Sequence, residues 1–333
     1  MIDRSLYDSA RSRSVWVERP ARGRLWITGA DRASYLQGLL TNDIKAIAAA
    51  GGCYAAWLTP QGRMITDMRL YELGDGLLMT LPAATAAAAC DRLDELIFSE
   101  NVTVEDRTAS WTGIGVHGPS AASDLARALG VDPVPSLAPF ESRRLVFGGG
   151  DIVVARTDEL GGGLDVFAAG PGGELRRRLT AAAVPQAGAG VAEVLRVEAG
   201  IPEFGVDMDT DTIPLEAGIE ARAISFTKGC YVGQEVIVRV LHRGQGRVAR
   251  RLVGLTIGEG GDDPPVPAPG AVLRADGRDV GRVTSAVVSP ALARTIALGY
   301  VQRDFVEPGT RLLVAHGDRT LSAVVTNVPF VPV

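Results

Sequence analysis

Cysteine and histidine are both scarce in this sequence, with three of each among 333 residues. Three cysteines at wide spacing do not form a disulfide framework, and the chain has no Cys-x-x-Cys pair. The histidines, at positions 117, 242 and 316, lack the spacing of a zinc site. The sequence therefore predicts neither a disulfide-stabilised protein nor a metal centre.

Long apolar runs and a strong excess of one charge are also missing. The Ala-rich stretch Ala83–Ala89 is far too short to span a bilayer, and the first twenty residues lack the apolar run of a signal peptide. The chain has 34 basic and 39 acidic residues, so its net charge of -5 provides no general attraction to nucleic acid or anionic lipid. We therefore expect a cytoplasmic protein without a membrane partner.

Glycine and proline are abundant instead, with 40 and 19 residues, and they divide the chain into short elements. Strand patterns within Cys53–Leu81 are separated by turns at Pro60–Arg63 and Gly74–Gly76. Helical spacing of apolar residues occurs over residues 31–40, 83–98, 120–129 and 174–183. Strands and helices follow one another without strict alternation, which predicts an α+β fold rather than a doubly wound sheet.

The last 85 or so residues have a different pattern. After a turn-rich stretch at 258–270, short strands are predicted at 272–273, 280–288, 295–301, 312–314 and 323–325. Short antiparallel strands joined by tight turns are typical of a small β-barrel.

Cys230 is a candidate reactive group. A lone cysteine is most often a small buried apolar residue, and Cys53 and Cys90 fit that description. Around Cys230, however, Gly229 and Gly233 allow the backbone to turn sharply and approach a ligand. Lys228 would favour the thiolate if its ammonium group faced the sulfur, which sequence spacing alone does not settle.

Two carboxylates are further candidates. Glu198 could be an ordinary solvated position, but its two oxygens are also suited to the amino group and ring N–H of a pterin. Asp67 lies on an otherwise apolar strand, where a buried and unpaired carboxylate would be costly. It must therefore face solvent, a cation or a ligand.

A basic run extends from Arg239 to Arg251 and includes His242, Arg243, Arg247 and Arg250. We expect it on a strand and the loop that follows. A solvated face is one interpretation, and a site for the glutamate tail of a folate or for RNA phosphate is the other. Aromatic residues do not interleave with these arginines, which weakens the RNA interpretation.

An ordered set of motifs resembles the glycine-cleavage T-protein superfamily along nearly the whole chain. The motifs lie at Gly29–Ile44, Gln61–Met68, Gly118–Pro119, Arg196–Glu216 and Gly281–Tyr300. Within that superfamily, the segment Lys228–Glu235, which reads Lys-Gly-Cys-Tyr-Val-Gly-Gln-Glu, resembles the YgfZ-type folate-binding proteins.

The resemblance implies a three-domain cloverleaf around a central folate channel. We expect a discontinuous folate-binding domain at 1–48 plus 141–245, an α+β domain at 49–140 and the C-terminal barrel at 246–333. The implied cofactor is tetrahydrofolate or a derivative.

The resemblance also implies site residues. Glu198 would contact the pterin, Asp67 would lie near the reactive folate nitrogens, and Cys230 would supply a reactive thiol at the channel. The remaining expected binding residues are Lys228, Gly229, Tyr231, Gly233, Gln234, Glu235 and Arg239.

For function, the YgfZ branch implies an accessory protein for iron–sulfur cluster assembly or repair, with iron–sulfur client or assembly proteins as partners. The alternatives are a folate-dependent aminomethyl or methyl transferase and a tRNA-binding module. Thr66-Asp67 stands where T-proteins carry paired acids, and the stretch 156–163 departs from their Thr-Gly-Glu-x-Gly pattern. Both departures favour the accessory branch.

Overall fold

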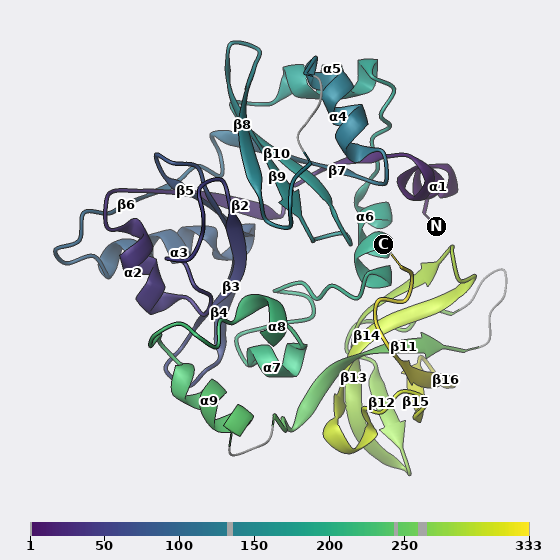
Figure 1. The fold of residues 1–333 in the computed structure, drawn as a ribbon. Coiled ribbons are helices and arrows are strands. Elements are labelled where there is room, and N and C mark those ends of the chain that lie inside the picture. Colours follow the sequence, from purple (N-terminus) through teal and green to yellow (C-terminus); the bar gives the residue numbers. More distant parts are fainter. Residues whose placement is uncertain (1, 132–135, 243–245, 259–264, 333) are drawn as a thin grey trace. The chain divides into compact units, whose positions relative to one another are not determined.

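The computed structural model describes residues 2–131, 136–242, 246–258 and 265–332 (Figure 1). The chain forms two compact units. Unit 1 comprises Met1–Thr59, Ile65–Val191 and Arg222–Val232, and unit 2 comprises Pro60–Met64, Ala192–Ala221 and Gly233–Val333. Each unit is therefore assembled from segments that are far apart in sequence.

The first sheet of unit 1 is antiparallel where its register is defined, and its strand order is β3-β4-β5-β2-β6. The strands are β2 (Arg22–Thr28), β3 (Gly52–Leu58), β4 (Met64–Glu72), β5 (Leu77–Pro82) and β6 (Thr103–Asp106). Helices α2 (Arg32–Leu39) and α3 (Ala83–Glu95) cover one face. Apolar residues of both helices and of the strands form one buried cluster there, which includes Leu36, Trp57, Met68 and Leu93.

The second sheet of unit 1 has the order β1-β7-β10-β9-β8. Its strands are β1 (Val15–Glu18), β7 (Trp111–His117), β8 (Ser142–Phe147), β9 (Gly150–Thr157) and β10 (Gly163–Ala169). Helices α4 (Ala121–Leu129) and α5 (Gly173–Ala181) pack on it through Leu125, Leu175 and Leu179, and α1 (Arg4–Ser12) precedes β1.

The facing sides of the two sheets share a small apolar core. Trp26, Tyr71 and Leu78 of the first sheet pack against Val153 and Phe167 of the second. Unit 1 is thus layered as helices, sheet, sheet and helices, and a polar group between the sheets has little access to water.

Unit 2 contains a closed six-stranded barrel of order β11-β14-β13-β12-β15-β16 (Figure 1). Its strands are β11 (Arg250–Ile257), β12 (Val272–Ala275), β13 (Arg278–Ser289), β14 (Arg294–Gln302), β15 (Arg311–His316) and β16 (Arg319–Thr326), with η1 at Arg303–Phe305. Its helices are α6 (Ala189–Glu198, which begins in unit 1), α7 (Pro214–Ala217), α8 (Glu220–Ala223, which ends in unit 1) and α9 (Gln234–His242). Val197 of α6 packs on Ile296 and Leu298 of the barrel.

The α+β fold and the small antiparallel barrel are confirmed. Strand β11 was not predicted, because a stretch of arginines opens it. The expectation of a strand at Arg239 was wrong, since α9 covers that position. The β-branched residues of α9 (Val236, Ile237, Val238 and Val240) are typical of a strand. They do not, however, alternate with polar residues in the period-2 pattern of a half-buried strand. Arg243 lies outside the described residues, and the three-domain boundaries stay a prediction.

Candidate functional site

Asp67 lies between the two sheets of unit 1. It alternates with Arg69 and Tyr71 along β4, so these three side chains share the face that meets the second sheet. Only 3% of Asp67 is exposed. The Tyr54 hydroxyl of β3 donates to Asp67 Oδ2 at 2.7 Å, whereas Oδ1 has no hydrogen-bond partner among the described residues. One buried carboxylate oxygen therefore lacks a hydrogen-bond donor within the described part of the chain.

Tyr54 is held in place by two cations. The guanidinium carbons of Arg69 and Arg222 lie 5.0 Å and 5.2 Å from the centroid of its ring. Burial, together with the negative charge of Asp67, raises the pKa of Tyr54 well above its usual value. The phenol therefore stays protonated and donates a hydrogen bond to Asp67.

A network of arginines and carboxylates continues from Arg69. Arg69 pairs with Asp158 and with Glu159, both at 2.8 Å, and Arg222 also pairs with Asp158. Burial would raise the pKa of Glu159, but its arginine neighbours outweigh burial and hold that pKa far below the usual range. The remaining pairs are Arg22–Glu159 at 3.0 Å, Arg19–Glu159 at 3.4 Å and Arg19–Asp165 at 3.2 Å. The network orients the two arginines that flank Tyr54.

His117 is also part of this network, but it is not a candidate base. Burial, reinforced by the charge of Arg19, lowers the pKa of His117 to about 3. The ring is therefore neutral at pH 7, and the neighbours assign its tautomer. Nδ1 donates to the carbonyl of Gly162 at 2.7 Å, and Nε2 accepts from Arg19 at 2.8 Å. Both ring nitrogens are already used.

Lys228 anchors the segment around Cys230 to the end of α2. Its Nζ donates to the carbonyls of Gln37, Leu40 and Asn42 at 2.6, 2.7 and 2.8 Å. The C-terminus of a helix exposes carbonyl oxygens and carries partial negative charge, so an ammonium group is well suited to it. Burial lowers the pKa of Lys228 to about 8. The Lys228 ammonium group therefore binds the carbonyls of Gln37, Leu40 and Asn42, and no hydrogen bond or ion pair directs it to the thiol of Cys230 in the described structure.

The neighbours of Lys228 divide into buried and exposed residues. Tyr231 is buried, and its ring centroid lies 5.2 Å from Lys228 Nζ. Gly229 and Cys230 are exposed. Cys53, in contrast, is buried, and burial raises the pKa of its thiol to about 12. The predicted reactive cysteine is therefore the exposed one, on a segment that Lys228 holds in place.

A chain of hydrogen bonds connects this segment with Asp67. The carbonyl of Asn42 accepts from Lys228, and the Asn42 side-chain amide donates to the carbonyls of Tyr54 and Arg222. Tyr54 in turn donates to Asp67. Within unit 1 the structure thus brings two of the predicted regions, around Asp67 and around Lys228, into one bonded system.

Glu198 is the last residue of α6, in unit 2, and it is fully buried. The Ser289 hydroxyl of β13 donates to its Oε1 at 2.5 Å. The interpretation of Glu198 as a solvated position was wrong, because the end of α6 packs against the barrel.

A second buried carboxylate of unit 2, Asp207, accepts from Arg196 at 2.5 Å, from Thr284 at 2.5 Å and from Ser285 at 2.7 Å. These bonds fix the Arg196–Asp207 segment against the barrel, and with it the backbone that carries Glu198.

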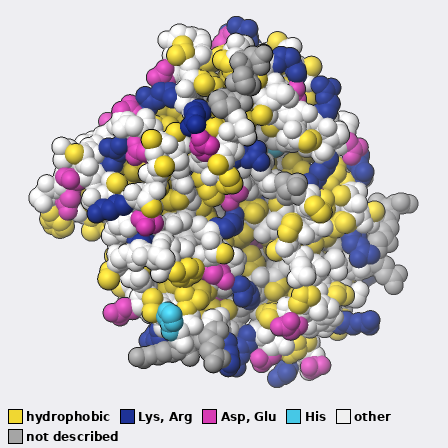
Figure 2. Space-filling view, in the orientation of Figure 1, with side chains coloured by type: hydrophobic (Ala, Val, Ile, Leu, Met, Phe, Trp, Pro, Cys, Tyr) yellow, Lys and Arg dark blue, Asp and Glu magenta, His cyan; other side chains and the backbone are white. Residues whose placement is uncertain are grey.

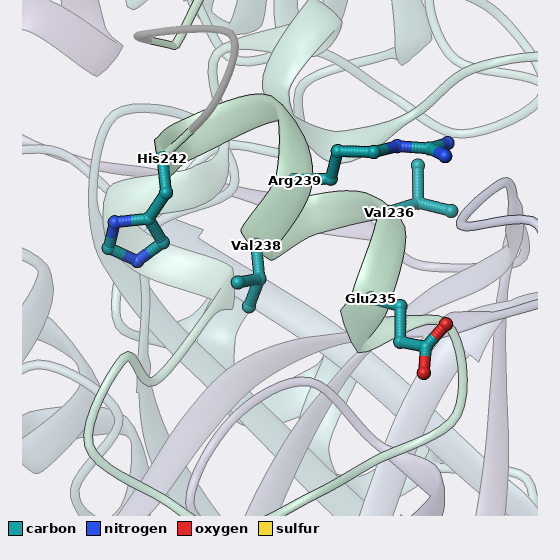
Figure 3. Close-up of a pocket in the computed structure, with 5 residues that line it drawn as sticks. All are labelled: Glu235, Val236, Val238, Arg239 and His242. Atoms are coloured by element: carbon teal, nitrogen blue, oxygen red, sulfur yellow. The ribbon is translucent and has the colours of Figure 1, made fainter.

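The other predicted binding residues lie around α9 in unit 2. Glu235 and Arg239 line a pocket of about 390 Å³, together with Val236, Val238 and His242. Figure 3 shows Arg239 and Val236 on one side of the helix and His242 and Val238 on the other. Gly233 precedes α9 with a φ of +85°, and Gln234 is its first residue. A pocket of this size, with both charges at its wall, can hold a polar small molecule.

Four residues of the Asp67 region were not predicted: Tyr54, Arg69, Arg222 and Glu159. Sequence reasoning could have found Arg69, because Asp67, Arg69 and Tyr71 alternate within an apolar strand whose two faces are both buried. Tyr54 comes from the neighbouring strand β3, and Glu159 and Arg222 are brought in from distant segments.

The basic run is partly neutralised. Arg250 pairs with Glu216 at 3.1 Å, and Arg251 pairs with Glu220 at 2.9 Å. On the face drawn in Figure 2, basic and acidic side chains are interspersed. A continuous positive surface of the kind that attracts nucleic acid is not visible on that face.

Across the part of the chain that the structure describes, no group of three or more metal-ligating side chains is placed to hold an ion. None of the described helices is both long and apolar enough to cross a membrane.

Comparison with known proteins agrees with the fold. The family described as GCVT N-terminal domain matches residues 8–228, and that described as Glycine cleavage T-protein C-terminal barrel domain matches residues 250–332. An aminomethyltransferase of Rubrobacter xylanophilus is 30% identical over 328 residues, which cover 97% of this chain and 85% of the relative. An aminomethyltransferase of Thermosynechococcus vestitus is 31% identical over 311 residues, which cover 92% of this chain and 82% of the relative.

A solved structure shares the fold. The glycine cleavage system aminomethyltransferase T from Bartonella henselae superposes with a TM-score of 0.87 at 22% identity, over 98% of this chain and 89% of that one. This likeness shows the fold, and the two family matches together span most of the chain. The chain belongs to the glycine-cleavage T-protein superfamily.

Proposed function

We propose that the protein binds tetrahydrofolate and takes part in one-carbon transfer of the aminomethyltransferase kind. The observation that carries the proposal is Asp67 Oδ1, a buried carboxylate oxygen without a hydrogen-bond partner among the described residues. Leaving a buried acceptor unsatisfied costs about 1–3 kcal/mol, which a donor on a bound ligand would recover. The aminomethyltransferase names of the relatives support the same activity.

The residues present fit this cofactor. The pterin ring of tetrahydrofolate carries an amino group and ring N–H groups, which are donors that buried carboxylates can accept. Asp67 in unit 1 and Glu198 in unit 2 are buried carboxylates of this kind. Bound tetrahydrofolate would supply the nitrogen atoms that carry the one-carbon unit.

The chain would contribute orientation and a proton acceptor. Tyr54 holds Asp67 through Oδ2, so that Oδ1 is left to bind a substrate ammonium group or to accept its proton. Thr66, the residue before it, is hydrogen-bonded to Thr85 at 2.9 Å and bears no carboxylate. Asp67 would therefore act without the second acid that the resemblance implies for T-proteins.

Titration with tetrahydrofolate tests the binding proposal. Replacing Glu198 by alanine removes two acceptors, so we expect the binding free energy to weaken by about 1.5–3 kcal/mol, the range for hydrogen bonds to charged groups. Isothermal titration calorimetry on the native protein and on Glu198→Ala measures this directly.

The exposed Glu95 at the end of α3 provides a matched control, since Glu95→Ala makes the same change in charge outside the candidate site. If Glu198→Ala unfolds, Glu198→Gln keeps the shape of the side chain. Equal affinity in the native protein and a folded Glu198 variant would contradict the role of Glu198, and absence of any binding would contradict the proposal itself.

A second candidate function rests on Cys230. Its thiol is exposed on a segment that Lys228 fastens to the end of α2, which suits contact with another protein. The octet Lys228–Glu235 resembles the YgfZ-type proteins, so this candidate is an accessory role towards iron–sulfur enzymes. A tRNA-binding role is less favoured, because Arg250 and Arg251 are already paired with glutamates.

Complementation distinguishes the two candidates. In a strain that lacks this protein, Cys230→Ala is expected to abolish rescue of iron–sulfur enzyme activity if the second candidate holds, because alanine removes the thiol. Tetrahydrofolate affinity should stay unchanged in the same variant. Cys90→Ala, which removes a partly buried cysteine, serves as the control. Full rescue by Cys230→Ala would exclude the thiol from this role.

A further inference from the structure

Three arginines of unit 1 line a pocket that the folate proposal does not use. The pocket measures about 440 Å³ and lies where the ends of α1, α4 and α5 approach one another. Its lining consists of Arg13, Arg127, Ala128, Arg178 and Ala181–Ala183. We call it the arginine pocket. Its described lining contains no carboxylate, although the chain as a whole is acidic.

Arg127 is held in a fixed position at the wall. Its Nη2 donates to Asp124 at 2.7 Å and to the carbonyl of Ala182 at 2.8 Å. Asp124 is itself buried and accepts from the Ser14 hydroxyl at 2.5 Å. A guanidinium group has five N–H donors, so most of those on Arg127 remain available. The cost of ordering this side chain has therefore already been met in the free protein.

Arg13 and Arg178 add charge of the same sign. The Arg13 guanidinium has neither a hydrogen-bond nor an ion-pair partner in the described part of the chain. Arg178 is exposed and pairs with Glu174 at 2.9 Å, an i,i+4 contact along α5. Surface pairs of this kind are weak, so Arg178 can turn to a stronger anion. Among the described residues Arg127 and Arg178 each have a carboxylate partner and Arg13 has none, so an anionic ligand would supply the negative charge that Arg13 lacks.

The floor of the pocket is made of small side chains. Helix α5 ends there in a tight turn, in which the N–H groups of Ala183 and Val184 donate to the carbonyls of Thr180 and Leu179 at 2.9 Å and 3.0 Å. Ala183 adopts a φ of +56° at this turn, a conformation that normally favours glycine. Methyl groups leave room for a ligand to reach all three guanidinium groups.

The geometry points to a binding site for the phosphate monoester of a small molecule in the arginine pocket, separate from the folate site. A dianionic phosphoryl group offers acceptors on several sides, and arginine forks match that arrangement. The volume corresponds to a small metabolite rather than to a polymer. This inference does not depend on the proposed one-carbon transfer.

Calorimetric titration at constant ionic strength, with glycerol 3-phosphate and inorganic phosphate as probes, tests whether the arginine pocket binds a phosphate monoester. We expect binding to the native protein, and about a tenfold or greater rise in Kd for each of Arg13→Gln and Arg178→Gln, because each loses charged hydrogen bonds. Neither substitution exposes a buried carboxylate, so both variants should fold, which circular dichroism verifies.

Arg177→Gln is the matched control. Arg177 neighbours Arg178 on α5, is exposed and pairs with the same Glu174, but it does not line the pocket. Its Kd should equal that of the native protein. An equal loss in Arg177→Gln, or no binding of either phosphate by the native protein, would overturn the proposal. A 5′-phosphorylated RNA that binds more tightly than the monoester through Arg13 and Arg178 would also overturn it.

Discussion

Replacing Glu159 by glutamine is expected to lower the free energy of unfolding by about 3–5 kcal/mol, the range for breaking a buried ion pair from one side. The Glu159 carboxylate is paired with Arg19, Arg22 and Arg69. The side chains of these arginines are only 10%, 11% and 5% exposed. Glutamine has nearly the same size as glutamate, but it removes the negative charge that the three buried arginines share. Urea unfolding of both proteins at pH 7 measures the difference.

The difference should depend on pH in a defined direction. The pKa of Glu159 is lower in the folded state than in the unfolded state. Its stabilising contribution is therefore present above the unfolded pKa of about 4.3 and is lost as pH falls below that value. Native protein and Glu159→Gln should accordingly approach each other in stability in acid.

An exposed pair supplies the control for Glu159. Glu105 pairs with Arg107 at 2.9 Å, and its side chain is 51% exposed. Glu105→Gln should cost about 0–1 kcal/mol, the range for surface pairs. If both variants lose a comparable amount of unfolding free energy, burial of the ion pairs around Glu159 is not the cause of the stabilisation.

Replacing Asp67 by asparagine is expected to reduce turnover in one-carbon transfer about 10²- to 10⁴-fold, the range for loss of a positioned acid or base. Asparagine can still accept the Tyr54 hydroxyl through its oxygen. Its amide nitrogen then stands where Oδ1 was, so an acceptor becomes a donor. Separate measurement of kcat and KM, with thermal unfolding alongside, distinguishes a chemical effect from a folding effect.

Thr66→Ser is the control for Asp67, since it changes the adjacent residue on the opposite face of β4 and keeps its hydroxyl. Tyr54→Phe should lower kcat less than Asp67→Asn, because it removes only the group that orients the carboxylate. Native turnover in a folded Asp67→Asn protein would remove Asp67 from the chemistry and leave the one-carbon transfer proposal without its main support.

Much of the fold is predictable because turns and strands are indicated by residues that are close together in the sequence. Turns at Pro60–Arg63 and Gly74–Gly76 separate the strands β3, β4 and β5, and the barrel has short strands with tight turns. Local patterns fail at α9, where consecutive β-branched residues favour a strand but the chain is helical.

The candidate site is less predictable, because its contacts are long-range. Asp67 could be predicted as an unusual carboxylate, yet its partner Tyr54 lies on another strand. Arg69 meets Asp158 from 89 residues away, and Lys228 meets Leu40 from 188 residues away. Nothing in the spacing of a single sequence encodes such pairings. For Lys228 the neighbouring cysteine suggested a role towards the thiol, whereas the structure directs its charge to the carbonyls at the end of α2.

The discontinuity of unit 1 has a consequence for how the protein is made. Its last segment, Arg222–Val232, is synthesised only after residues 192–221 of unit 2. Until then Asp158 lacks Arg222, and the carbonyls at the end of α2 lack Lys228. A nascent chain that ends before residue 222 therefore carries both sheets of unit 1 but not the lysine and arginine that close it. Although domains generally fold in order from the N-terminus, completion of this first unit must wait for part of the second.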